Sequence, residues 1–173
     1  MRSRARLFGH PVHPMFIVFP LGLLAASLIF DVISLASGNG DWSLAAFYMI
    51  AAGVVSGLVA AVPGLVDWLA IPKRTRAKSI GAIHGLGNVV VVALFAMSWV
   101  MRYDSRAHTE SGPFVLSIIG VALALVTGWL GGELVDRLGI GVDEGANANA
   151  PSSLSGRPAA PETRVLREQE TRV

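Results

Sequence analysis

The sequence has no cysteine among its 173 residues, and only 15% of its residues are charged. Without cysteine the chain cannot form disulfides, thiolate zinc sites or cysteine-ligated iron–sulfur clusters. A soluble domain carries about 25% charged residues. This chain is instead 53% hydrophobic, with a mean hydropathy of +0.57. The composition therefore excludes an ordinary soluble enzyme.

Familiar catalytic motifs are also missing. The sequence has no Ser/His/Asp arrangement, no glycine-rich phosphate loop and no H-E-x-x-H helix. A membrane-bound enzyme remains possible, but catalysis has no positive support.

Four long apolar segments dominate what is present. They cover about residues 15–35, 43–66, 80–101 and 114–130. A bilayer core requires about 20 helical residues, whereas buried strands last about 4–8 residues. We therefore predict an all-α fold, a bundle of four transmembrane helices within residues 15–141. A basic N-terminus (1–14) precedes it and a polar tail (142–173) follows it.

The basic residues flank these segments, so the net charge of +2 does not indicate a nucleic-acid partner. Arginines occupy the N-terminus, four cations occupy 72–79, and 37–41 has none. The positive-inside rule then places both termini in the cytoplasm. A cleaved signal peptide is the alternative for the N-terminus. The Ala-, Asn-, Ser- and Pro-rich tail cannot bury much apolar surface, so we expect a disordered cytosolic segment.

Small residues recur at four-residue spacing in the last three apolar segments, as in Gly53 and Gly57 or Gly81 and Gly85. Such spacing lets transmembrane helices approach closely, either within one chain or in a homodimer. A weak repeat at an offset of 71 relates His13 to His84. It suggests two related helical hairpins.

The predicted topology brings ionisable side chains from several helices to the inner end of the bundle. Two histidines lie in His10-Pro11-Val12-His13-Pro14, directly before the first apolar segment. Imidazoles at such a position can ligate a metal or haem iron, or relay protons. The candidate ligands are His10, His13 and His84, with Asp67, Asn88 and Glu133 as supporting groups.

Each candidate also has a simpler interpretation. His10 and His13 could bind headgroups or water, and His84 could form an interhelical hydrogen bond. Asp67 could orient a histidine or pair with a nearby cation such as Arg74. Glu133 could be a solvated helix end.

Asp31 lies in the outer half of the first apolar segment. A carboxylate there is costly in lipid, so we expect it to face inward, towards Arg102.

Several motifs resemble one known family. They are the paired His-Pro run, Phe19-Pro20, Asp31, Gly64-x-x-Asp67, the lone His84, and the ending 128–135 with 139–142. Together they resemble domain of unknown function 2231 over about residues 8–143. The resemblance implies a four-helix protein of the bacterial inner membrane without an established activity. Some relatives look fused to Rieske-type domains, and relatives often have histidine where this chain has Glu133.

Three functions follow as hypotheses. The first is a redox or electron-transfer protein that binds haem b or a transition metal (Fe, Zn or Cu) through its histidines. The second is a non-catalytic structural or assembly subunit of a membrane complex. The third is a small transporter, for which the expected pair of broken helices is missing. The expected partners are the lipid bilayer and a redox or other membrane-complex partner, or a second copy.

Overall fold

The structure, a computed structural model, describes residues 1–160. Four helical segments in it are long and apolar enough to cross a membrane: Val12–Ser37, Gly40–Ala70, Arg76–Met101 and Ser111–Arg137. Each contains one of the predicted apolar segments. The all-α, four-helix prediction is therefore confirmed, and the protein is a multi-pass membrane protein.

The first membrane segment is broken into two helices, α1 (Val12–Phe16) and α2 (Val18–Ser37). Pro20 explains the break at Ile17, because it has no N–H to donate to the carbonyl of Phe16. The helix α3 (Gly40–Ala70) starts at an Asn39 cap and continues through Pro63. Ile17 keeps helical backbone angles, and its N–H donates to the His13 carbonyl at 3.1 Å, so α1 and α2 form one continuous span with an irregular turn at this point.

The second half of the bundle contains α4 (Arg76–Met101) and α5 (Ser111–Gly132). Thr75 caps α4, and its hydroxyl accepts from the Lys78 backbone N–H at 3.1 Å. α5 continues into a π-helical turn, η1 (Glu133–Arg137). Most helix ends lie beyond the predicted apolar limits, because polar interfacial residues such as Asp67 and Lys78 remain helical.

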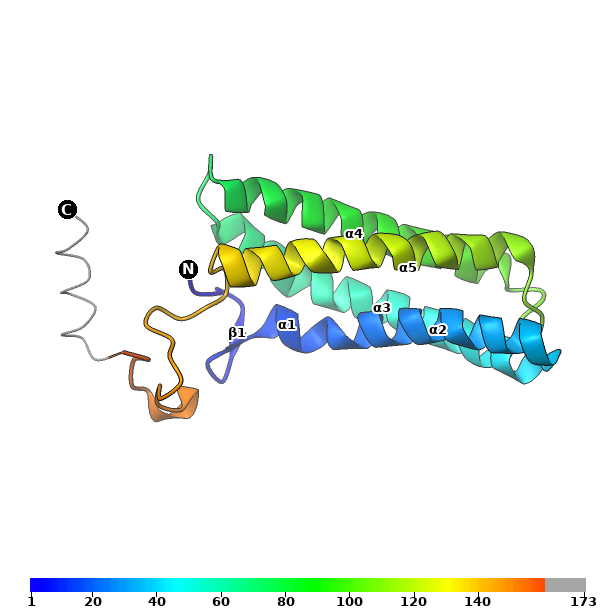
Figure 1. The fold of residues 1–173 in the computed structure, drawn as a ribbon, viewed down its shortest axis with the longest axis horizontal. Coiled ribbons are helices and arrows are strands. Elements are labelled where there is room, and N and C mark those ends of the chain that lie inside the picture. Colours follow the sequence, from blue (N-terminus) through cyan, green and yellow to red (C-terminus); the bar gives the residue numbers. More distant parts are fainter. Residues whose placement is uncertain (161–173) are drawn as a thin grey trace.

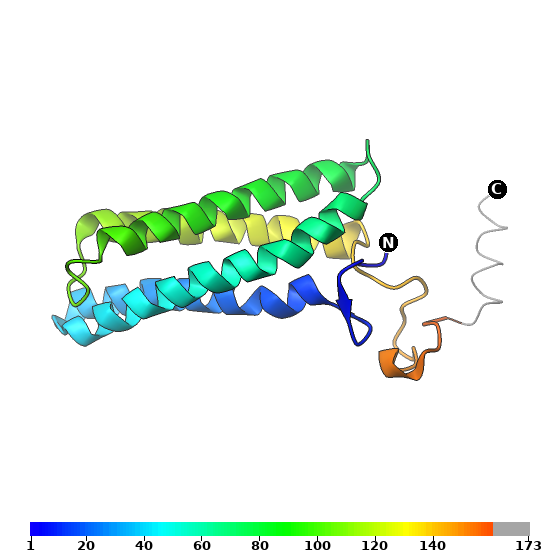
Figure 2. The same ribbon diagram turned by 180° about the vertical axis from the view of Figure 1, so that it is seen from behind.

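The helices form two hairpins, α2 with α3 and α4 with α5, which pack against each other through α3–α4 and α2–α5 (Figures 1 and 2). We call the end with the N-terminus and residues 133–160 the proximal end. The end with the α2–α3 and α4–α5 connections is the distal end. This arrangement brings the starts of α1 and α4 to the same end of the bundle.

Small residues allow close packing inside the chain. The buried cluster of Leu24, Ile50, Val91 and Phe95 lies between the hairpins. A Cβ added at Gly120 would meet the Phe95 ring at 2.7 Å, and one at Gly53 would meet Leu24 at 2.5 Å. These two glycines therefore serve packing within one bundle.

A buried polar network lies at the distal end. Arg102 donates to both carboxylate oxygens of Asp31 at 2.6 and 2.7 Å, and both side chains are almost fully buried. Ser98 and Ser117 accept from the same guanidinium at 3.2 Å. Asp31 thus faces inward, paired with the cation that the sequence indicates.

The N-terminal residues and the segment that follows η1 meet at the proximal end. Residues 6–11 form a two-stranded hairpin, β1 (Arg6–Leu7) and β2 (His10–Pro11). Residues 142–160, where we expected disorder, form turns and one short helix, η2 (Ser153–Ser155), beside this hairpin. The rest of the predicted disordered tail, 161–173, lies outside the described residues.

Candidate functional site

His13 is the second residue of α1, and its side chain reaches the backbone of α3. Its Nδ1 lies 2.8 Å from the carbonyl oxygen of Ala60. Gly64 follows this carbonyl by one helical turn, and helical Cβ atoms tilt back towards the N-terminus. A Cβ at Gly64 would lie 2.8 Å from His13 Nδ1. The glycine therefore leaves the space that the imidazole occupies.

His84 repeats this arrangement in the second hairpin. Its Nδ1 lies 2.8 Å from the carbonyl oxygen of Thr127 on α5. Gly131 again follows the acceptor by four residues, and a Cβ there would lie 3.1 Å from His84 Cε1. The two histidines are 71 residues apart in the sequence, whereas the two acceptors are 67 residues apart and so are the two glycines. Each hairpin thus carries one equivalent histidine, carbonyl and glycine set.

The two imidazoles lie next to each other. Their ring centroids are 6.3 Å apart, and the ring planes are almost perpendicular, at 86°. A neutral imidazole that donates from Nδ1 to a carbonyl keeps a lone pair on Nε2. Metal-binding histidines commonly have this form, with the second nitrogen held by a carbonyl or carboxylate.

Asn88 supports His84 from one turn along α4. Its Nδ2 donates to the His84 carbonyl at 2.8 Å and lies 3.4 Å from His84 Nε2. Its Oδ1 accepts from the Thr127 hydroxyl at 3.2 Å. Asn88 therefore links α4 to α5 beside the imidazole, and a ligand on Nε2 would replace its long contact with the ring.

Asp67 binds the N-terminal residues of the chain, whereas the sequence suggested that it could orient a histidine. Its carboxylate accepts from the Ser3 hydroxyl at 2.7 Å and from the backbone N–H groups of Arg4 and Ala5 at 2.6 and 3.0 Å. We call residues 1–11 the N-terminal strap. Asp67 anchors this strap to α3.

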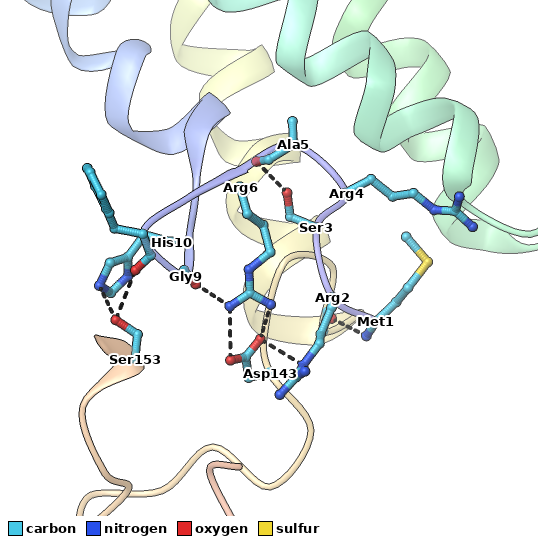
Figure 3. Close-up of polar contacts among 12 residues, drawn as sticks. Met1, Arg2, Ser3, Arg4, Ala5, Arg6, Gly9, His10, Asp143 and Ser153 are labelled. Carbon is cyan, nitrogen blue, oxygen red and sulfur yellow. Dashed lines mark hydrogen bonds and ion pairs between the residues drawn. The ribbon is translucent and has the colours of Figure 1, made fainter. Parts of the chain in front are cut away.

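His10 and Glu133 also have other neighbours. His10 is exposed, with Nε2 3.2 Å from the Ser153 hydroxyl (Figure 3). Glu133 pairs with Arg76 at 2.6 Å. Within residues 1–160 no group of three His, Cys, Asp or Glu side chains is arranged to hold a metal ion. Of the predicted ligands, the structure brings together His13 and His84.

A second cluster joins the strap to the segment after η1. Arg6 donates to both oxygens of Asp143 at 2.8 and 3.2 Å and also to the Gly9 carbonyl (Figure 3). Arg2 contacts the same carboxylate at 3.1 Å. The hydrogen bond from Arg6 is the main cause that lowers the pKa of Asp143 below its ordinary value.

Several of these contacts were not predicted from the sequence. Ala60 and Thr127 act through backbone carbonyls, which any residue type supplies. Gly64 and Gly131 can be recognised in the sequence. Gly64 lies 51 residues after His13 and Gly131 lies 47 residues after His84, each near the end of the next long apolar segment. For the strap, the sequence feature is the position of Asp143, which is the first acidic residue after the last helical turn and can pair with the N-terminal arginines.

Comparisons with known proteins give one match. A family model described as "Predicted membrane protein (DUF2231)" matches residues 9–144. The matched range includes both His-Pro pairs, both glycines of the site and His84. Neither a curated protein nor a solved structure matches the chain.

Proposed function

The chain belongs to the DUF2231 family of predicted membrane proteins, and from the geometry of its histidines we propose that His13 and His84 are the two protein ligands of one haem. The protein would then be an electron-transfer component of the membrane. The observation that carries the proposal is the pair of adjacent imidazoles, each with Nδ1 held by a backbone carbonyl.

The separation of the rings fits two imidazoles that would hold the same metal. A metal–imidazole nitrogen bond is about 2.0–2.1 Å, and the ring centroid lies about 1.1 Å beyond that nitrogen. Two imidazoles on one metal would thus have centroids at most about 6 Å apart, close to the 6.3 Å separation of His13 and His84. Two glycines leave room for the rings.

The number of protein ligands favours haem over a bare metal ion. A structural or catalytic zinc site needs three or four protein ligands, and residues 1–160 contain no such cluster. A haem supplies four nitrogens itself and can be held by one or two protein ligands, and helix bundles build cofactor sites from side chains on facing helices. Bound haem would supply one-electron chemistry, and the chain's part is to hold the two imidazoles.

Charge supports an orientation for the site. Lys73, Arg74, Arg76 and Lys78 lie at the proximal end with the arginines of the strap. The positive-inside rule therefore favours a cytoplasmic position for this end, in the inner membrane of a bacterium. The histidine pair would lie near the cytoplasmic surface.

A structural role is the competing function. Each imidazole already makes an interhelical hydrogen bond within its own hairpin, and perpendicular rings with centroids about 4.5–7 Å apart are a normal aromatic arrangement. The histidines would then hold together a non-catalytic subunit of a membrane complex. Under this function the purified protein would bind no haem.

The test is the absorption spectrum of protein purified in detergent from cells supplied with a haem precursor. We expect a Soret band, and a sharp α-band after dithionite reduction, at one haem per chain by pyridine haemochrome assay. His13→Ala and His84→Ala should each lose the six-coordinate spectrum. His10→Ala and His108→Ala are the matched controls and should retain it.

Elemental analysis of the same samples separates haem from a bare metal. Protein without haem that fails to take up added hemin, and that holds no stoichiometric metal, would contradict the proposal and favour the structural role. If the protein holds a stoichiometric metal but shows no Soret band, the histidines are a metal site and the haem proposal is contradicted.

A further inference from the structure

The β1–β2 hairpin presents two apolar side chains at its turn. Leu7 is 46% exposed and Phe8 is 75% exposed. Phe8 has φ +50° and Gly9 has φ +86°. Two-residue hairpin turns with positive φ at both positions favour Asn-Gly, and a bulky residue there is strained. The preference of the turn therefore does not explain an aromatic residue at position 8.

The rest of the hairpin is held firmly by polar contacts. Arg6 binds both Asp143 and the Gly9 carbonyl, as Figure 3 shows. The Val12 N–H donates to the Ala5 carbonyl at 2.8 Å, and Ser153 donates to the Phe8 carbonyl at 3.2 Å. A strained residue persists when its surroundings determine its conformation, and such residues point to function.

The hairpin lies beside the proximal ends of the helices that can span a membrane. Figures 1 and 2 show it just before α1, at the same level along the bundle as the proximal ends of α4 and α5. The start of the first span also exposes apolar side chains: Met15 is 45%, Val18 58% and Phe19 53% exposed. Arg4, on the same strap, is exposed.

We propose that the tip formed by Leu7 and Phe8 inserts into the bilayer at the boundary between headgroups and acyl chains. Aromatic side chains favour this layer, and neighbouring cations favour anionic headgroups. The tip would anchor the start of α1 and set the depth at which His13 enters the membrane. This proposal depends on the four membrane spans and not on haem binding.

The natural absence of cysteine gives a direct experiment. Phe8→Cys provides a single site for an environment-sensitive bimane label in the full chain. The labelled protein is reconstituted in vesicles of phosphatidylcholine and phosphatidylglycerol. Quenching is then measured with lipids brominated near the headgroup, and separately with aqueous iodide. Asn149→Cys, an exposed polar position on the same end, is the aqueous control, and Val18→Cys is the reference within the first span.

We expect brominated lipid to quench residue 8 at least twofold more strongly than residue 149, and iodide to quench it at least twofold less. Equal access of iodide to residues 8 and 149 would overturn the proposal. Protection of residue 8 that grows with the protein-to-lipid ratio would indicate contact with a second copy, and would also overturn it.

A second variant separates the side chain from the turn. Asn tolerates the left-handed conformation, so Phe8→Asn should keep the hairpin while it removes the apolar tip. With the label at Leu7→Cys, Phe8→Asn should lower quenching by brominated lipid at least twofold, with an unchanged elution profile and helix content. Unchanged quenching would show that Phe8 does not anchor the tip.

Discussion

Asp31 on α2 and Arg102 at the end of α4 form a bidentate ion pair that joins the two hairpins at the distal end of the bundle, with oxygen–nitrogen distances of 2.6 and 2.7 Å. The Arg102 side chain is 1% exposed and the Asp31 side chain is 0% exposed. Charges are costly in lipid, so this pair is stable only as a complete unit with its serine partners. The histidine pair lies at the opposite end of the same two hairpins.

Removing one partner of this pair should be strongly destabilising. Asp31→Ala and Arg102→Ala should each lower the free energy of unfolding by about 3–5 kcal/mol, because each leaves a buried charge unpaired. The double variant should cost much less than the sum of the two. Denaturation in detergent micelles measures both effects. The control is Glu133→Ala, which breaks a more exposed pair with Arg76 and should lower the free energy of unfolding by about 0–1 kcal/mol. If the losses of free energy for Asp31→Ala and Arg102→Ala simply add in the double variant, the account is contradicted.

The glycines below the imidazoles should be sensitive to a single methyl group. Gly64→Ala places a Cβ 2.8 Å from His13 Nδ1, and Gly131→Ala places one 3.1 Å from His84 Cε1. Both contacts are closer than van der Waals distance, so each variant should weaken hemin binding at least tenfold in a spectroscopic titration. Gly22→Ala and Gly128→Ala are the controls, because a Cβ there meets nothing within 4 Å. They should leave binding unchanged and stabilise the helix by about 0.5–1 kcal/mol. Equal effects at all four positions would show that the rings do not depend on the glycines.

Asp67 should hold the N-terminal strap rather than the histidines. A hydrogen bond to a charged group contributes about 1.5–3 kcal/mol, and Asp67 accepts three such bonds from the strap. Asp67→Ala should therefore raise the rate of tryptic cleavage after Arg4 and Arg6 by at least tenfold. Asp136→Asn, an exposed acid at the same end, is the control. A slow cleavage rate in Asp67→Ala would mean that other contacts suffice to hold the strap.

The strap should also loosen in acid. Arg6 lowers the pKa of Asp143 in the folded protein, so the contact stabilises the fold fully above the ordinary carboxyl pKa. That contribution is lost as the pH falls through the lowered value. Hydrogen exchange of residues 2–11 should accelerate in this acidic range. The acceleration should be absent in Asp143→Asn, and an identical pH profile in that variant would assign it to another group.

The sequence predicts the bundle because lipid leaves few alternatives for long apolar segments, which must be helical and must cross the membrane. It also places His13 and His84 at one end, since helices that start on the same side share a depth. It does not predict the partners of Asp67, Glu133 and His10. These depend on how the strap and residues 139–153 fold over the bundle end, and loop contacts have no sequence period.

The sequence also does not predict that each imidazole pairs with a backbone carbonyl. Ala60 and Thr127 contribute main-chain oxygen, so their residue types carry no information about the contact. The repeat at an offset of 71 relates the histidines correctly, but the acceptors repeat at 67 because the hairpins differ in length. The sequence feature that does accompany this contact is a glycine near the end of the second apolar segment of each hairpin, Gly64 after His13 and Gly131 after His84.

The most direct test of the account is electron paramagnetic resonance of the ferric protein after loading with hemin. Wild-type protein should give a low-spin signal, because both His13 and His84 would hold the iron. His13→Ala and His84→Ala should each convert the iron to a high-spin form, and the double variant should bind no haem specifically. A low-spin signal that survives in both single variants, or a wild-type protein that takes up no haem, would contradict the central claim that these two histidines form one ligand pair.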